Sequence, residues 1–247
     1  MSKKSAELSR SERAAAAIAA QRTQERRRNL LVVGGVVALV VAVLAGAYVF
    51  SSSSDTSGET ASDVPAGVED YSVVVGEESA PSTITVYEDP QCPICRDFEA
   101  AVGEQVATAV EAGDVKVDYR IVSFLDRASG NEYSSRAANA LMAVQDVAGP
   151  DAFAALHETL FANQPEEGSD GPDDEQLVAW AVEAGAEESE VRPLIEGKVF
   201  EQFVVNATDQ MSQDGVTGTP TVLIDGQPAG ENPAEYAAAV LDVVSGD

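Results

Sequence analysis

Short segments of apolar, β-branched and aromatic residues predict β-strands in the middle of the chain. Residues 71–75 and 83–87 are rich in valine, isoleucine, tyrosine and threonine, and turn-forming residues separate them. Between residues 93 and 112, apolar side chains recur at four-residue steps with charged residues between them, which predicts an amphipathic helix. Residues 116–122 alternate between polar and apolar side chains and predict a third strand. These segments form a β-α-β unit.

A helical region follows this unit. Apolar side chains keep three- and four-residue spacing from about residue 128 to residue 212, and turn-forming residues, above all 164–174, divide the region into separate helices. Strand character returns at 221–224, and residues 233–244 predict a final helix that Asn232 can cap. The chain therefore predicts an α/β domain in which two β-containing units flank a helical insertion at about 128–212.

The first fifty residues have a different pattern. Residues 30–50 contain no charged side chain, and their number matches the roughly 20 apolar residues that cross a bilayer as a helix. Residues 1–29 carry eight lysine or arginine side chains against three glutamates, so the positive-inside rule predicts a basic cytoplasmic tail. Residues 51–66, rich in serine, threonine, glycine and aspartate, predict a flexible linker to the folded domain at 67–247.

A cleaved signal peptide is the alternative interpretation of residues 30–50. Ala45-Gly46-Ala47 has the small-x-small pattern of a cleavage site, and Arg27-Arg28 loosely resembles a twin-arginine signal. The apolar stretch exceeds the about 7 to 15 residues of a signal-peptide h-region, which favours an uncleaved anchor. Both interpretations export the domain.

The charge and the cysteine content limit the partners and cofactors of the chain. The formal net charge is −27, and the acidic residues gather after the apolar segment. A surface this negative repels the phosphate backbone, so no nucleic-acid partner is expected. Two cysteines exclude a scaffold of several disulfides and a four-thiolate metal site within one chain, and we expect neither a metal nor another cofactor.

The two cysteines, Cys92 and Cys95, stand where the strand at 83–87 passes into the helix at 93–112. Pro93 suits the first helical position and disfavours helical geometry for the residue before it, which makes Cys92 the N-cap. The sulfur of an accessible Cys92 then faces the free N–H groups of the first turn, so its pKa should fall below the usual value of about 8.5. We expect Cys92 to attack and Cys95, on the same helix face, to resolve the mixed disulfide.

Two segments together are similar to a known family. Residues 87–98 read YEDPQCPICRDF and residues 215–221 read GVTGTPT, and both resemble the DsbA-like branch of the thioredoxin superfamily. The resemblance extends from about residue 73 to the C-terminus and includes the helical insertion. It implies a thioredoxin-like fold, preceded here by one transmembrane helix, and thiol-disulfide exchange at the Cys92–Cys95 pair.

The resemblance also implies a substrate-binding site. In that family the proline at the position of Pro220 is cis and packs against the cysteine pair, and the residue at the position of Thr219 offers its backbone to an extended substrate peptide. Thr219 and Pro220 are therefore assigned to substrate binding, together with Pro93 and Ile94 between the cysteines.

The chain departs from the family pattern before the cysteines. Pro90 stands where relatives often have phenylalanine, and Val86 stands where thioredoxin and DsbA carry a buried acid. Glu88 or Asp89 could accept a proton instead, although a solvated carboxylate at a strand end is the commoner interpretation. The single histidine, His157, is expected to be structural.

Three functions agree with these features. The first is a membrane-anchored enzyme outside the cytoplasm that passes the Cys92–Cys95 disulfide to exported client proteins with free thiols and is reoxidised by a membrane redox partner. The second is a reductase or isomerase of the same fold. The third is an anchored peptide-binding module, without enzymatic activity, whose cysteines form a structural disulfide. We favour the first, because a helix N-terminus stabilises the reduced form and makes the disulfide more oxidising.

Overall fold

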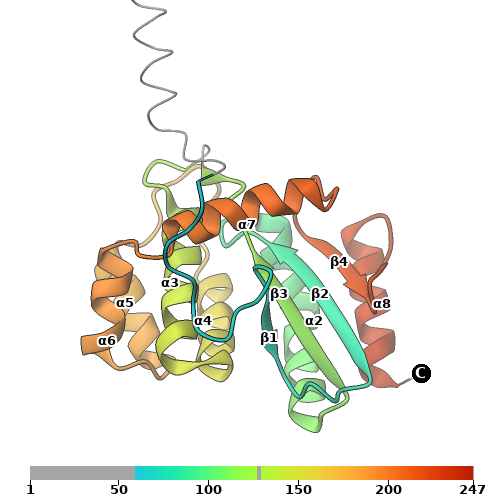
Figure 1. Cartoon of the computed structure of the whole chain (residues 1–247). Coiled ribbons are helices and arrows are strands. Elements are labelled where there is room, and N and C mark those ends of the chain that lie inside the picture. The colour runs from blue at the N-terminus through green and yellow to red at the C-terminus, as the bar shows by residue number, and fades with distance from the viewer. Residues whose placement is uncertain (1–58, 127–128, 247) are drawn as a thin grey trace, which may run out of the picture. The chain divides into compact units, whose positions relative to one another are not determined.

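The computed structural model describes residues 59–126 and 129–246 (Figure 1). The predicted tail at 1–29, the predicted span at 30–50 and the first half of the linker at 51–66 lie outside the described residues. Among the helices that are described, none is both long and apolar enough to cross a membrane.

In residues 59–126 and 129–246, a mixed sheet of five strands forms the centre of the domain, with the strand order β1-β3-β2-β4-β5. The two central strands, β2 (Ser82–Glu88) and β3 (Val115–Ile121), are parallel, and every other neighbouring pair is antiparallel. Along β3, buried side chains alternate with half-exposed ones, as expected for a strand with one face on the core. The outer strands are β1 (Val73–Val75), β4 (Thr221–Ile224) and β5 (Gln227–Pro228).

The first strand is two residues shorter than the sequence predicts. Asp70 and Tyr71 have φ angles of 49° and 61°, which belong to the left-handed region and cannot continue an extended strand. The strand therefore begins only after this turn. The short β5 was not predicted at all.

Helix α2 (Pro93–Ala112) crosses from β2 to β3, and α8 (Pro233–Ser245) packs beside it (Figure 1). The apolar stripe of α2 is buried as predicted, including Phe98, Val102 and Val106. The Asn232 side chain accepts a hydrogen bond from the backbone N–H of Glu235 at 3.2 Å, so the predicted N-cap of α8 is present.

Within the part of the insertion that the structure describes there are five helices, with α3 at their centre. Of the 16 residues of α3, 13 are buried, because α4, α5, α6 and α7 all pack against this helix. Figure 1 shows the insertion to the left of the sheet, with α7 lying across the top. The five helices are α3 (Tyr133–Ala148), α4 (Pro150–Ala162), α5 (Asp174–Glu183), α6 (Glu188–Glu196) and α7 (Glu201–Gln213).

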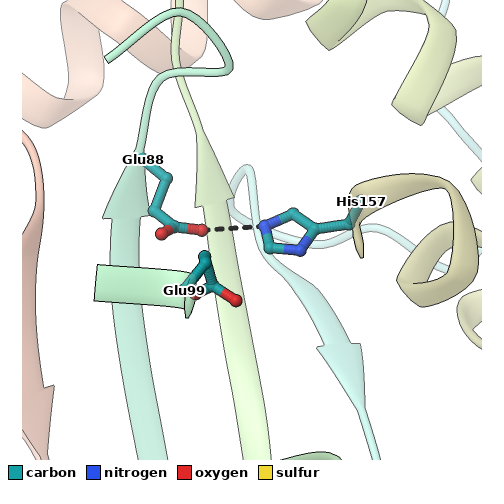
Figure 2. A group of neighbouring side chains, drawn as sticks. All are labelled: Glu88, Glu99 and His157. Carbon is teal, nitrogen blue, oxygen red and sulfur yellow. Dashed lines mark hydrogen bonds and ion pairs between the residues drawn. The ribbon is translucent and has the colours of Figure 1, made fainter. Parts of the chain in front are cut away.

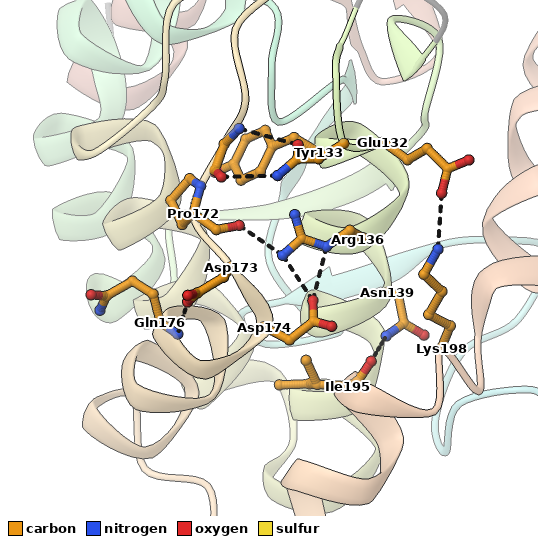
Figure 3. Close-up of polar contacts among 12 residues, drawn as sticks. Glu132, Tyr133, Arg136, Asn139, Pro172, Asp173, Asp174, Gln176, Ile195 and Lys198 are labelled. Atoms are coloured by element: carbon orange, nitrogen blue, oxygen red, sulfur yellow. Dashed lines mark hydrogen bonds and ion pairs between the residues drawn. The ribbon is translucent and has the colours of Figure 1, made fainter.

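Buried polar side chains of α3 hold the insertion together (Figure 3). Arg136 donates to the Asp174 carboxylate at 2.8 Å at the start of α5. Asn139 donates to the backbone carbonyl of Ile195 at 3.4 Å, and its own side-chain oxygen accepts from the backbone N–H of Phe200 at 2.8 Å. One asparagine thus joins α3 to the end of α6 and the start of α7.

Candidate active site

An active-site loop, residues 89–92, leads from the carboxyl end of β2 into α2. Cys92 is the N-cap of α2, with extended backbone angles of φ −73° and ψ 116°, and Pro93 occupies the start of the helix. This is the geometry that Pro93 predicts. The backbone N–H of Cys92 donates to the carbonyl of Asp89 at 2.9 Å, which closes the loop into a turn.

The two free thiols differ in their proton affinity. A hydrogen bond from the Cys95 thiol lowers the pKa of Cys92 to about 6, although burial opposes this shift. The Thr219 side chain and the backbone N–H groups of the first turn of α2 act in the same direction. Burial, the hydrogen bond to Cys92 and the negative charge of Glu88 raise the pKa of Cys95 well above its ordinary value. Cys92 is therefore the thiol that ionises first.

The substrate-binding residues inferred from the family lie in two places. The Cys92 thiol donates to the backbone carbonyl of Thr219 at 3.4 Å, and the Thr219–Pro220 peptide bond is cis. Ile94 lies on the surface and is 47% exposed. Cys92 itself is only 5% exposed, so the prediction that its sulfur is accessible is wrong. The loop that contains Thr219 packs against this sulfur.

The expectation of solvated carboxylates at the end of β2 is also wrong, because Glu88 and Asp89 are both fully buried. The Asp89 carboxylate accepts hydrogen bonds from the backbone N–H of Gln91 at 2.8 Å, the Ser134 hydroxyl at 2.7 Å and the backbone N–H of Leu125 at 2.7 Å. Burial nevertheless raises its pKa to about 6. Through these contacts, Asp89 holds the active-site loop in place against Leu125 and Ser134.

Glu88 belongs to a second buried group, shown in Figure 2. Its Oε2 lies 2.8 Å from Nε2 of His157, which α4 contributes. Glu99, one turn beyond Cys95 in α2, is the third member. Burial is the main reason that the pKa of each of the two glutamates rises to about 8.

Sequence reasoning missed this grouping and one further contact. Glu99 could have been found from its position four residues after Cys95, on the same helix face. No local signal marks His157, because the packing of α4 against α2 brings it there. The further contact is made by Gln164, which no local sequence signal marks either. Its side-chain amide donates to the backbone carbonyls of Cys92 at 2.9 Å and Pro90 at 3.1 Å.

Comparison with known proteins identifies the family. A family model described as Thioredoxin matches residues 69–242, which cover the sheet, the insertion and both cysteines. The chain belongs to this family. Oxidised DsbA from Mycobacterium tuberculosis is 33% identical, with a TM-score of 0.60 over 71% of this chain and 93% of that chain. Reduced DsbG from the same organism is also 33% identical, with a TM-score of 0.61 over 71% and 88% of the two chains.

These relatives place the chain in the DsbA-like branch of the thioredoxin superfamily, as a thiol-disulfide oxidoreductase. The predicted thioredoxin-like fold with a helical insertion is confirmed, and the interpretation as a module without enzymatic activity is set aside. The serine/threonine-protein kinase PknE of Mycobacterium tuberculosis is 30% identical over 157 residues. That match covers 61% of this chain, which spans only 28% of the length of the kinase.

Proposed function

We propose that this oxidoreductase is a disulfide donor that oxidises exported proteins through Cys92 and Cys95. The observation that carries the proposal is the opposite shift of the two thiol pKa values, to about 6 for Cys92 and well above the ordinary value for Cys95. A stabilised Cys92 thiolate favours the reduced enzyme, and a stabilised reduced form makes the disulfide more oxidising.

The proposed reaction proceeds through a mixed disulfide on Cys92. A client thiolate attacks the Cys92 sulfur of the oxidised enzyme, the Cys92–Cys95 bond breaks, and Cys95 leaves and takes up a proton. A second client thiolate then attacks the client sulfur of the mixed disulfide and releases the Cys92 thiolate. The client loses two electrons and two protons, and the enzyme pair gains the two electrons. In the reverse direction, Cys95 resolves the mixed disulfide.

Residues around Cys92 are proposed to bind the client chain. The backbone of Thr219, preceding Pro220, lies within 3.4 Å of the Cys92 sulfur and can pair with an extended peptide. Between the cysteines, Pro93 and the exposed Ile94 offer an apolar contact beside the reacting sulfur.

The proposed location is the outer side of a membrane. The basic tail at 1–29 stays in the cytoplasm, residues 30–50 span the bilayer, and the domain at 67–247 faces the exported proteins. With only two cysteines, the chain cannot pass electrons to an internal relay pair. Reoxidation therefore requires an oxidant from outside the chain, and we propose a redox partner in the membrane.

The reduction potential tests the proposal. Equilibration of the enzyme with glutathione buffers should give a potential above the roughly −270 mV of thioredoxin. The reduced form should also resist denaturant better than the oxidised form, since the thiolate stabilises the folded reduced protein. A potential at or below that of thioredoxin, with the oxidised form more stable, would instead indicate a reductase.

A further inference from the structure

Three buried or partly buried side chains from three separate elements converge near the cysteine pair. Glu88 comes from the end of β2, Glu99 from α2 and His157 from α4. One ligand atom of each, a carboxylate oxygen or an imidazole nitrogen, lies within 4.8 Å of the others. Figure 2 shows the Glu88 carboxylate facing His157, with Glu99 below it in this view.

One oxygen of this cluster lacks a hydrogen-bond donor. Glu88 is fully buried, and while its Oε2 pairs with His157, its Oε1 has no donor among the described residues. The neighbouring Glu99 carboxyl group can serve this oxygen only if a proton lies between the two groups. A buried carboxylate oxygen without a partner is costly, and either a proton held by Glu99 or a cation between Glu88 and Glu99 satisfies it.

The ligand types suit a divalent cation. A dication neutralises both carboxylates by displacing the protons that they otherwise hold. Tyr119, Phe153 and Phe161 place their rings 4.6, 6.1 and 4.8 Å from the His157 ring, which makes the surroundings apolar. An apolar surrounding strengthens the attraction between a cation and carboxylates.

We propose that Glu88, Glu99 and His157 bind one divalent transition-metal ion of the zinc class. Imidazole nitrogen together with carboxylate oxygen suits Zn²⁺, whereas Mg²⁺ and Ca²⁺ prefer oxygen ligands throughout. The ion takes the place of the proton in the 2.8 Å contact between Nε2 of His157 and Oε2 of Glu88, and this proton passes to solvent. Nε2 of the neutral imidazole, whose ring proton is on Nδ1, then becomes a ligand. Three protein ligands leave one tetrahedral position open.

Such an ion would join the sheet to the insertion, since its ligands come from β2, α2 and α4. It uses neither cysteine, and it does not depend on whether the enzyme oxidises or reduces its clients. A ligand that binds only the folded state stabilises that state, so occupancy should raise the temperature of unfolding.

The test uses the full chain carrying Cys92→Ser and Cys95→Ser, because thiolates would otherwise bind zinc themselves. Titration with Zn²⁺ alone, followed by calorimetry, should show one ion per chain and a higher unfolding temperature. Mg²⁺ at the same concentration should leave that temperature unchanged. Co²⁺ in place of Zn²⁺ should give the visible absorption of a four-coordinate site without a sulfur charge-transfer band.

Single substitutions in the same background assign the ligands. Glu99→Gln and His157→Gln should each weaken Zn²⁺ binding by roughly tenfold or more, since each removes one of three ligands. The control is Glu158→Gln, which removes an exposed charge beside His157 and should leave the affinity within about twofold. Glutamine has nearly the shape of glutamate, and Glu99 is partly exposed, so the Glu99→Gln variant should fold. It therefore tests the site even if the His157→Gln variant does not fold. Failure of Zn²⁺ to bind the thiol-free chain, or equal affinity in all variants, would overturn the proposal and leave a shared proton in its place.

Discussion

Cys92 and Cys95 lie three residues apart, yet their surroundings separate their chemistry. The Cys92 sulfur meets donors: the Cys95 thiol, the Thr219 side chain and the first N–H groups of α2. The Cys95 sulfur is fully buried and feels the negative charge of Glu88. Hydrogen-bond donors stabilise the thiolate of Cys92, whereas burial destabilises the thiolate of Cys95. The negative charge therefore lies on Cys92.

Alkylation of the reduced enzyme checks this assignment. Iodoacetamide should modify Cys92 before Cys95, with a rate that rises through a midpoint near pH 6. Cys95→Ala should move the midpoint to higher pH because it removes the strongest donor, whereas Cys95→Ser keeps a hydroxyl donor and should move it less. Modification of Cys95 first, or a midpoint near the usual pKa of about 8.5, would contradict the assignment.

The same shift links the stability of the reduced enzyme to pH. Between about pH 6 and pH 9 the folded Cys92 is a thiolate while the unfolded one is a thiol, so the unfolded state binds more protons. The contribution of Cys92 to the free energy of unfolding therefore rises with pH across this window and is lost as the pH falls through about 6.

For single residues, the sequence predicted the conformation or burial of a side chain only where neighbouring residues in the chain determine it. Pro93 alone determines that Cys92 caps a helix, and the structure agrees. The burial of Glu88 and Asp89 depends on Ser134 and His157, which lie more than forty residues further along the chain. A strand-end carboxylate therefore looked solvated until the insertion was in place.

Among the elements, α3 decides whether the insertion keeps its shape. Asn139→Ala should lower the free energy of unfolding by about 1–3 kcal/mol, because the buried N–H of Phe200 loses its acceptor. Urea denaturation measures this change. Asn163→Ala, at an exposed helix end, is the matched control and should stay within about 0.5 kcal/mol of the parent. Equal losses in the two variants would show that the buried contact has no special role.

Elements with a clear local pattern were the predictable ones, and they include the strands β2, β3 and β4 as well as helices. Helix α2 begins at Pro93 and ends at Ala112 as its apolar periodicity indicated, and α8 begins at its predicted cap. The two-residue strand β5 is defined only by its pairing with β4, so no local sequence pattern predicts it. How the insertion helices pack likewise depends on distant contacts.

For the whole molecule, the separation of charge along the chain makes a prediction about topology. Protease added to intact cells with an accessible outer face should degrade the acidic domain and spare the basic tail, because the positive-inside rule predicts a cytoplasmic location for that tail. A soluble cytoplasmic protein, intact throughout, is the control for lysis. Recovery of the domain in the medium, with a new N-terminus near Tyr48, would favour a cleaved signal peptide.

Both edges of the sheet are short. One edge strand, β1, has three residues, and the other, β5, has two, one of which is Pro228 without a backbone N–H. Long unpaired edges recruit strands from other chains and promote aggregation, and short edges or an edge proline prevent this. The proposed exported clients present such strands while they are incompletely folded. The short edges of this sheet give those strands little backbone with which to pair.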